Sequence, residues 1–255
     1  MIGLFDSGSG GLSVLREVHK RLPEADILYL GDIKNAPYGE KTPEKLFTLT
    51  INAIHFLQSS GASSIISACN SVSASLVVSL FDTLNLENSH LIEMVGPTVS
   101  YFRNSDESVF VCATPATVRA GLYRNGFNMI GKTFSEVAIP GLASAIEFGA
   151  TDMEIERIIR SAFKGVSYNS FDTLVLGCTH YPLVTHIFER VFGDSIRIFN
   201  PAEAVANRAK ERFLKTEKGD GVLRFAITKD SELFRTRVAE FFPENIDAVE
   251  VVSVK

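Results

Sequence analysis

The sequence predicts an α/β protein with mostly parallel sheets, and three observations carry this prediction. Short apolar runs bounded by turn residues alternate with longer stretches of helical period, which is typical of β-α units around a parallel sheet. A hydrophobic content of 45% in 255 residues is enough to bury a sizeable core. Two segments far apart in the chain also follow one pattern, which indicates two similar domains.

The elements follow in chain order. The first predicted strand is IGLF at 2–5, which leads into a glycine loop and then into LSVLREVHKRL at 12–22, whose apolar residues recur at helical spacing. Helices are expected after most of the later strands, and these strands are predicted at 26–30, 63–68, 108–113 and 172–177.

A domain boundary has to be inferred from the strand pattern, because no long Pro/Gly/Ser-rich linker divides the chain. The best candidate is ENSHLIEMVGP at 87–97. We therefore expect a first domain over 1–95, closed by the C-terminal segment 206–255, and a second domain over 96–205.

The repeated pattern consists of SIISACNSVSA at 64–74 and TLVLGCTHYPL at 173–183. Each has an apolar strand, a small residue, a cysteine and then hydrogen-bonding residues. Ligands of parallel α/β sheets bind outside the carboxyl ends of the strands. Two facing domains of this kind would place Cys69 and Cys178 on opposite sides of one cleft.

The composition limits the classes of function. The formal net charge is -5, and no Lys/Arg-rich stretch is present, so we expect no nucleic-acid partner. The sequence has neither a signal-peptide pattern nor an apolar run of the roughly 20 residues that span a bilayer, so we expect a cytoplasmic protein without a membrane partner. The three cysteines form no CxxC pair, which predicts free thiols and no metal site.

The flanking residues separate the three cysteines. Cys112 lies within an apolar run, which predicts a small buried hydrophobic residue. Cys69 and Cys178 each end a strand and precede polar residues, and such a position can lower a thiol pKa from about 8.5 and make the thiol a usable base. His180, two residues after Cys178, can exchange protons near neutral pH. A Cys-His pair also occurs in thiol hydrolases, but that alternative leaves the second cysteine unexplained.

Other polar residues have a structural and a functional interpretation side by side. DSGSGG at 6–11 matches no nucleotide motif, so its amides are candidates to hold an anion such as a substrate carboxylate, with Asp6 as either a cap or a functional acid. Tyr38 and Gly39 fit an ordinary tight turn. Helix capping explains one of Thr114 and Thr117, and ligand contact could explain the other. For Glu147, late in a predicted helix, a solvated surface carboxylate is the ordinary interpretation.

Together these motifs resemble those of the glutamate racemase family. The matching segments, in chain order, are FDSGSGGLSVL at 5–15, GDIKNAPYG at 31–39, ACNSVSA at 68–74, ATPATVRAGLY at 113–123 and GCTHYPL at 177–183. One departure is that Ser71 and Val72 stand where the family usually has threonine and alanine. The hydroxyl is kept, but the pocket shape can differ.

The resemblance implies two pseudo-symmetric α/β domains with the active site in the cleft between them. It implies a cofactor-independent interconversion of L- and D-glutamate, with Cys69 and Cys178 as the two acid/base residues and no pyridoxal phosphate. Asp6 and His180 would assist the thiols, and Glu147 would be a weaker third assistant. The implied substrate contacts are Asp6, Ser7, Tyr38, Gly39, Asn70, Ser71, Thr117, Thr179 and His180.

The family also implies a homodimer and a role in supplying D-glutamate for peptidoglycan synthesis. Two alternatives stay open. The protein could racemise another acidic amino acid such as aspartate, or it could be a binding or regulatory protein that kept the fold without turnover.

Overall fold

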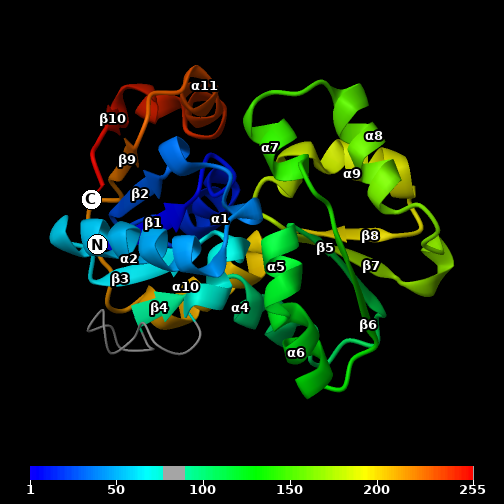
Figure 1. Ribbon diagram of the computed structural model, residues 1–255. Helices are drawn as coiled ribbons and strands as arrows, with labels where there is room; N and C mark the ends of the chain where they lie inside the picture. The colour runs from blue at the N-terminus through cyan, green and yellow to red at the C-terminus, as the bar shows by residue number, and fades with distance from the viewer. Residues whose placement is uncertain (77–89, 255) are drawn as a thin grey trace.

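The computed structural model describes residues 1–76 and 90–254, and two separate parallel sheets organise them into two lobes (Figure 1). The sheet of the first lobe has the order β10-β9-β2-β1-β3-β4. Its strands are β1 (Ile2–Asp6), β2 (Ile27–Gly31), β3 (Ser64–Ser67), β4 (Leu91–Ile92), β9 (Leu223–Ile227) and β10 (Val249–Val251).

The second lobe contains a sheet of order β6-β5-β7-β8. Its strands are β5 (Val109–Ala113), β6 (Phe134–Ala138), β7 (Thr173–Gly177) and β8 (Arg197–Phe199). Every pairing between the described strands is parallel. This confirms the predicted α/β class with mostly parallel sheets.

The two sheets are related by an internal repeat. The order β2-β1-β3-β4 in the first lobe corresponds to β6-β5-β7-β8 in the second. In this correspondence β3 is equivalent to β7, and these are the strands that precede Cys69 and Cys178. The five strands predicted from the sequence are all present, whereas β4, β6, β8, β9 and β10 were not predicted.

Helices cover both faces of each sheet. In the first lobe they are α1 (Leu12–Arg21), α2 (Pro43–Ser59), α10 (Ala202–Phe213) and α11 (Glu232–Phe241). Those associated with the second sheet are α4 (Val95–Tyr101), α5 (Pro115–Ala120), α6 (Leu122–Met129), α7 (Leu142–Glu147), α8 (Asp152–Ala162) and α9 (Thr185–Phe192). Short 3₁₀ segments occupy Ile33–Asn35, Tyr38–Glu40, Asn70–Leu76, Tyr168–Ser170, Tyr181–Val184 and Pro243–Ala248.

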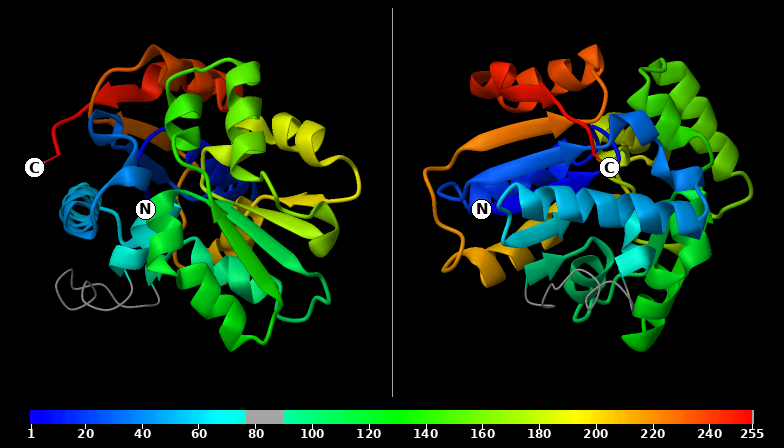
Figure 2. Two further views of the ribbon diagram at one scale, coloured as in Figure 1. Left: turned by 45° about the vertical axis from the view of Figure 1, so that its right-hand side comes forward. Right: turned by 60° about the vertical axis from the view of Figure 1, so that its left-hand side comes forward.

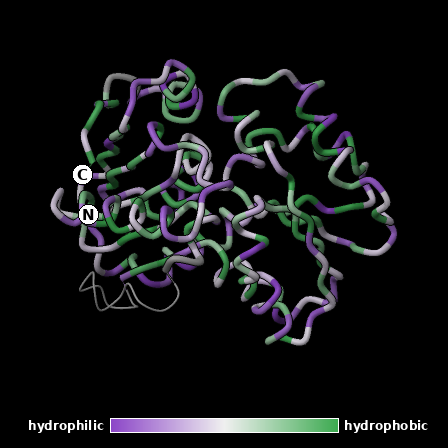
Figure 3. The backbone as a smooth tube through the Cα atoms, in the orientation of Figure 1, coloured by the Kyte–Doolittle hydropathy of each residue, from purple (hydrophilic) through white to green (hydrophobic). Residues whose placement is uncertain are grey.

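The cores follow from the alternation of side chains along the strands. Leu4 of β1 packs in a cluster with residues of α1, α10 and α11, whereas the next residue, Phe5, packs with residues of α2 on the opposite face. The second sheet is divided in the same way, with Phe110 towards α7, α8 and α9 and Val111 towards α4 and α6. Figure 2 shows α2 lying across the first sheet, and Figure 3 shows apolar stretches along the strands.

The C-terminal part of the chain returns to the first lobe. Strand β9 pairs with β2, β10 pairs with β9, and α10 packs along α1. The predicted boundary between 205 and 206 falls within α10, and the candidate boundary at 87–97 lies partly outside the described residues. The domain limits therefore stay a prediction. Within 1–76 and 90–254, no helix is long and apolar enough to cross a membrane.

Candidate active site

The carboxyl ends of the central strands bring the predicted site residues together from both lobes. Asp6 ends β1, Cys69 follows β3 and Cys178 follows β7. The Thr179 hydroxyl donates to Asp6 Oδ1 across the lobes at 3.1 Å. Both thiols are buried, and the charge of Cys178 contributes to the raised pKa of Cys69, so the two sulfurs share one electrostatic environment. The described residues thus define one site between the two sheets.

On the Cys178 side, a hydrogen-bonded chain runs from the thiol to a carboxylate. Cys178 Sγ lies 3.8 Å from His180 Nδ1, and His180 Nε2 lies 2.7 Å from Glu147 Oε2. Burial would lower the pKa of His180, but its hydrogen bonds to Cys178 and Glu147 and their charges raise this pKa well above its ordinary value. These interactions favour the protonated imidazole, which can stabilise a thiolate at Cys178.

For Glu147, the local interpretation as a solvated surface carboxylate is wrong. Its side chain is 3% exposed, and its Oε2 accepts a hydrogen bond of 2.6 Å from the Ser9 hydroxyl. Burial raises its pKa, but the hydrogen bond and charge of His180, with Ser9 and Arg237, lower the pKa of Glu147 to about 2. A position late in a helix predicts an exposed side chain, but Glu147 is the last residue of α7 and its side chain contacts Ser9 of the other lobe.

On the Cys69 side, the partners are hydroxyl and amide groups. The Cys69 thiol lies 3.8 Å from the Ser7 hydroxyl. Burial raises the pKa of Cys69 well above its ordinary value, and the charges of Asp6 and Cys178 add to this, although Ser7 and the Ser71 N–H group oppose it. The expected lowering of the thiol pKa is therefore wrong for Cys69, because desolvation and neighbouring negative charges exceed the effect of the local hydrogen bonds.

The glycine loop binds carboxylates of the protein itself. Asp6 Oδ2 accepts hydrogen bonds from the N–H groups of Gly8 and Gly11, and Ser9 N–H donates to Glu147. Asp6 is therefore a cap for the loop and also a buried acid. Burial raises its pKa, although His180 and the loop amides lower it. The expectation that the loop holds a substrate carboxylate fails for these three amides, because they already have acceptors.

Two glycines allow the close approach of segments that form the site. A Cβ at Gly10 would lie 2.8 Å from both His180 N and His180 Nδ1. At Gly39 a Cβ would lie 2.6 Å from Thr114 Cβ. Any side chain at either position would push the first lobe away from the second. Gly39 therefore has a role beyond the turn: it leaves room for Thr114 at the contact between the lobes.

A cluster of hydroxyl and amide groups lies beside Cys69. Thr114 Oγ1 is 2.9 Å from Ser71 Oγ and 3.0 Å from Thr117 Oγ1. Thr114 caps α5 by accepting from Thr117 N–H, so capping explains this threonine, as predicted for one of the two. The side-chain oxygen of Asn70, Oδ1, accepts a 2.7 Å hydrogen bond from the Tyr123 hydroxyl. The buried Asn70 Nδ2 has no hydrogen-bond partner among the described residues.

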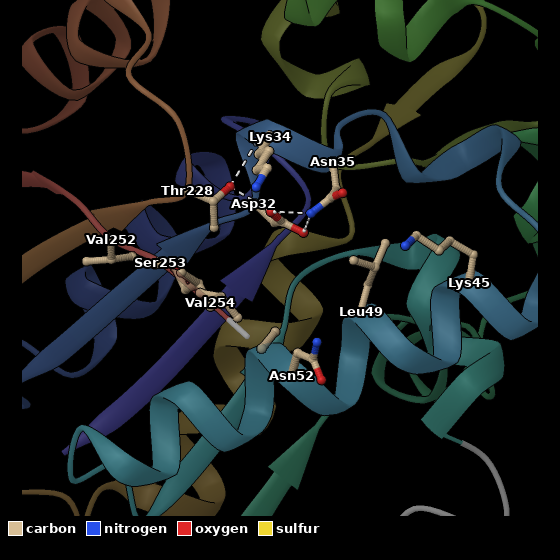
Figure 4. A pocket seen from close by; sticks show the side chains of 12 residues that line it. Asp32, Lys34, Asn35, Lys45, Leu49, Asn52, Thr228, Val252, Ser253 and Val254 are labelled. Atoms are coloured by element: carbon tan, nitrogen blue, oxygen red, sulfur yellow. Dashed lines mark hydrogen bonds between the residues drawn. The ribbon is translucent and has the colours of Figure 1, made fainter.

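Tyr38 is buried beside the same site, but its hydroxyl has a partner in the first lobe. It donates to Asp32 Oδ2 at 2.5 Å. Asp32 lines a hollow of about 350 Å³ between β2, α2 and the C-terminal segment (Figure 4). None of the predicted site residues lines this hollow. It is therefore distinct from the site that contains the two thiols.

Three residues of the network were not singled out from the sequence. Ser9 lies in the glycine loop, and the local sequence does not distinguish its hydroxyl from that of Ser7. Tyr123 is the last residue of the ATPATVRAGLY segment at 113–123. Arg237 lies on α11, in a part of the chain without a recognised motif. No local signal distinguishes Arg237 from a surface arginine of an amphipathic helix. Cys112 is buried in β5 with its thiol 3.6 Å from the Val175 carbonyl, as predicted for a hydrophobic residue.

The two-lobed fold, with a buried cysteine after equivalent strands of the two sheets, indicates the class of the protein. The sequence profile of the Asp/Glu/Hydantoin racemase family matches residues 8–209, and the chain belongs to this family. It is therefore an isomerase of the racemase class, as the sequence motifs predicted.

Within the family, the chain is similar to glutamate racemases. One from Desulforudis audaxviator is 33% identical over 94% of this chain and 93% of its own length. The crystal structure of glutamate racemase from Francisella tularensis in complex with D-glutamate superimposes with a TM-score of 0.85 at 25% identity, covering 100% of this chain and 97% of its own. The crystal structure of glutamate racemase from Thermus thermophilus in complex with beta-chloro-D-alanine superimposes with a TM-score of 0.82 at 28% identity. The match covers 99% of this chain and 96% of the other.

Proposed function

We propose that this protein interconverts L- and D-glutamate without a cofactor, with Cys69 and Cys178 as the two acid/base residues. One observation carries the proposal: the two buried thiols follow equivalent strands of two similar sheets, and each has a hydrogen-bonding partner of its own. Racemisation needs a base on one face of the α-carbon and an acid on the other. A repeat with one cysteine in each lobe supplies both.

In the proposed reaction, one cysteine acts as a thiolate and removes the α-proton. The other cysteine gives its thiol proton to the opposite face, so the configuration inverts and the two residues exchange roles. On the Cys178 side, the protonated His180 stabilises the thiolate. On the Cys69 side, the raised pKa keeps a proton on the sulfur of the free protein, which makes Cys69 the proton donor of the resting state.

Substrate binding is assigned to the groups that surround the thiols. The buried Asn70 Nδ2 without a partner supports a role as a donor to a substrate carboxylate, because an unpaired buried N–H group is costly unless a ligand accepts its hydrogen bond. The other proposed contacts are Asp6, Ser7, Tyr38, Gly39, Ser71, Thr117, Thr179 and His180. Preorganised donors of this kind stabilise the negative charge that develops at the α-carbon and carboxylate.

The compartment and partners belong to the same proposal. Catalysis by free thiols requires a reducing environment, which favours the cytoplasm. We further propose a homodimer and a role in supplying D-glutamate for peptidoglycan synthesis. Sedimentation of the purified protein at several concentrations measures the oligomeric state, and a single monomeric species would contradict the dimer.

The two-base assignment is tested by replacing each cysteine. Cys69→Ala and Cys178→Ala should each abolish racemisation of both enantiomers, measured by circular dichroism. In D2O, the wild-type protein should place deuterium at the α-carbon of the product from either enantiomer, because the incoming proton comes from a solvent-exchanged thiol. Retained racemisation in either variant would contradict the assignment.

Cys112→Ala is the matched control. It removes a third buried thiol, 3.6 Å from the Val175 carbonyl, outside the proposed chemistry. We expect normal racemisation and a loss of about 1 kcal/mol of stability, because a small cavity replaces the sulfur. Loss of activity in this variant would mean that the loss in the other two variants does not single out Cys69 and Cys178.

The same assay with aspartate tests the second candidate substrate. Faster turnover of aspartate than of glutamate would favour an aspartate racemase. Absence of turnover with both amino acids, in protein with both thiols reduced, would favour a binding or regulatory protein.

A further inference from the structure

Arg237 on α11 connects the C-terminal segment to the second lobe. Its guanidinium donates to the Ser9 hydroxyl, its Nη2 donates to the Ile146 carbonyl at 2.6 Å, and its Nη1 lies 3.3 Å from Glu147 Oε2. The side chain is 12% exposed. In Figure 1, α11 and α7 lie next to each other at the top of the molecule. The hydrogen bond from Arg237 to the Ile146 carbonyl joins these two helices.

The contacts of Arg237 fix the end of α7. The last carbonyls of a helix have no partner within the helix, and a cation near that end is favourable. The planar guanidinium adds a 2.6 Å hydrogen bond to the Ile146 carbonyl, whose backbone donor Gly149 N–H is 3.4 Å away, and it contacts Glu147 at the same time. The point charge of a lysine cannot reproduce both contacts. Glu147 Oε2 therefore has three donors nearby, from Ser9, His180 and Arg237.

The charge of Arg237 is compatible with this position. Burial lowers its pKa, but Glu147, Glu240 and Tyr29 oppose the change, and an arginine stays protonated throughout the physiological range. In the described part of the chain, its hydrogen bonds go to Ser9, Ile146 and Glu147, and none of them reaches the partners of Cys69. Its influence is therefore expected on one thiol only.

We propose that Arg237 is a positioning residue for the Cys178 half of the racemisation, holding Glu147 so that Glu147 orients the His180 ring towards Cys178. This rests on the proposed two-cysteine function. The C-terminal segment would then take part in catalysis through this side chain.

Arg237→Met tests the proposal through isotope effects. We expect kcat/KM to fall about 10- to 100-fold, as for loss of charge-assisted hydrogen bonds, and equally in both directions because the two enantiomers have equal free energy. With 2-deuterated glutamate, the primary deuterium isotope effect on kcat/KM should rise for the enantiomer whose α-proton Cys178 removes, because that step becomes slower. It should fall for the other enantiomer, whose C–D bond Cys69 breaks before the slowed step.

Arg237→Lys should restore part of the rate, since it keeps the charge but loses the second contact. Arg235→Met is the matched control on the same helix. Arg235 bonds the exposed Asp230 and the Val249 carbonyl of β10, and its loss should leave both isotope effects unchanged. Isotope effects that move in the same direction for both enantiomers, or a wild-type rate in Arg237→Met, would overturn the proposal. If the methionine variant fails to fold by circular dichroism, the same comparison in Arg237→Lys decides.

A failure of the proposed function gives a different result. If the wild-type protein does not racemise glutamate, the proposed function fails, and Arg237 is assessed from the ¹⁵N shifts of the His180 ring. These shifts should change in Arg237→Met and not in Arg235→Met. Unchanged His180 shifts in both variants would overturn the positioning role independently of activity.

Discussion

At the scale of single residues, the two thiols differ although their strands are equivalent. Cys178 lies beside the His180 imidazole, whose pKa is raised, whereas Cys69 lies beside the Ser7 hydroxyl and has a raised thiol pKa. A substrate ammonium group would bring a positive charge close to the thiols and favour a thiolate. The symmetry of the fold therefore does not extend to the electrostatics, and the two proton transfers are expected to have different barriers.

Tyr123 is predicted to set the orientation of the Asn70 amide. Because its hydroxyl donates to Asn70 Oδ1 at 2.7 Å, the amide nitrogen is left as a free donor. In Tyr123→Phe, loss of this hydrogen bond should raise KM for glutamate about three- to tenfold with little change in kcat, measured by initial rates. Tyr101→Phe, at an exposed tyrosine of α4, is the control. An unchanged KM would contradict the role of the Asn70 amide.

At the scale of elements, the loop 7–11 and the segment after β7 are packed against each other. Gly10 lies against His180, and Thr179 donates to Asp6 at the end of β1, just before the loop. Ser9 of the loop also donates to Glu147 at the end of α7. The loop therefore belongs to the catalytic arrangement through its backbone as much as through its side chains. Gly8 and Gly10 allow the contact between the lobes, because a Cβ at these positions would lie 2.8 Å from Glu147 and from His180, respectively.

Gly10→Ala is predicted to impair activity more than stability. Its Cβ would displace the His180 backbone and ring, so racemisation should fall at least about tenfold, as expected for a misplacement near 1 Å. Gly131→Ala is the control, because Gly131 has a φ of 69° and open space around it. That variant should lose about 1 kcal/mol of stability through backbone strain and keep its activity. Equal loss of activity in both variants would contradict the prediction.

At the scale of the whole molecule, charged groups buried between the lobes connect catalysis to stability. The pKa of Glu147 is about 2 in the folded protein against 4.5 as its ordinary value. A lowered folded pKa means that this carboxylate stabilises the protein above pH 4.5 and that the contribution is lost as the pH falls from 4.5 to 2. The contribution is about 3 kcal/mol, by the conversion of pKa shifts to free energy.

Glu147→Gln should therefore flatten the acid limb of the stability curve. The free energy of unfolding, from urea titrations between about pH 6 and 3, should fall less steeply in the variant than in the wild type. Glu189→Gln is the control, because Glu189 is exposed on the surface of α9. Parallel curves for the wild type and Glu147→Gln would mean that the pair with His180 does not stabilise the fold.

Local signals account for the part of the fold that could be predicted. Five strands have continuous apolar runs bounded by turn residues, and they are buried in parallel sheets, where such runs are expected. The short strands β4 and β8 are too brief for a periodic signal, and β9 and β10 carry no motif. Cys69 and Cys178 could be distinguished from Cys112 because polar residues follow them at once.

The sequence by itself determined the α/β class, the repeat with its two cysteines and the glycine loop, since strand periodicity, turn residues and local motifs depend on neighbouring residues. Only the tertiary structure decided that Glu147 is buried against His180, that the loop amides bind Asp6 and Glu147, and that Arg237 reaches the same carboxylate. It also decided that the pKa of Cys69 is raised. Burial and charge are set by segments that are far apart in the chain, and such contacts leave no pattern in the residues around them.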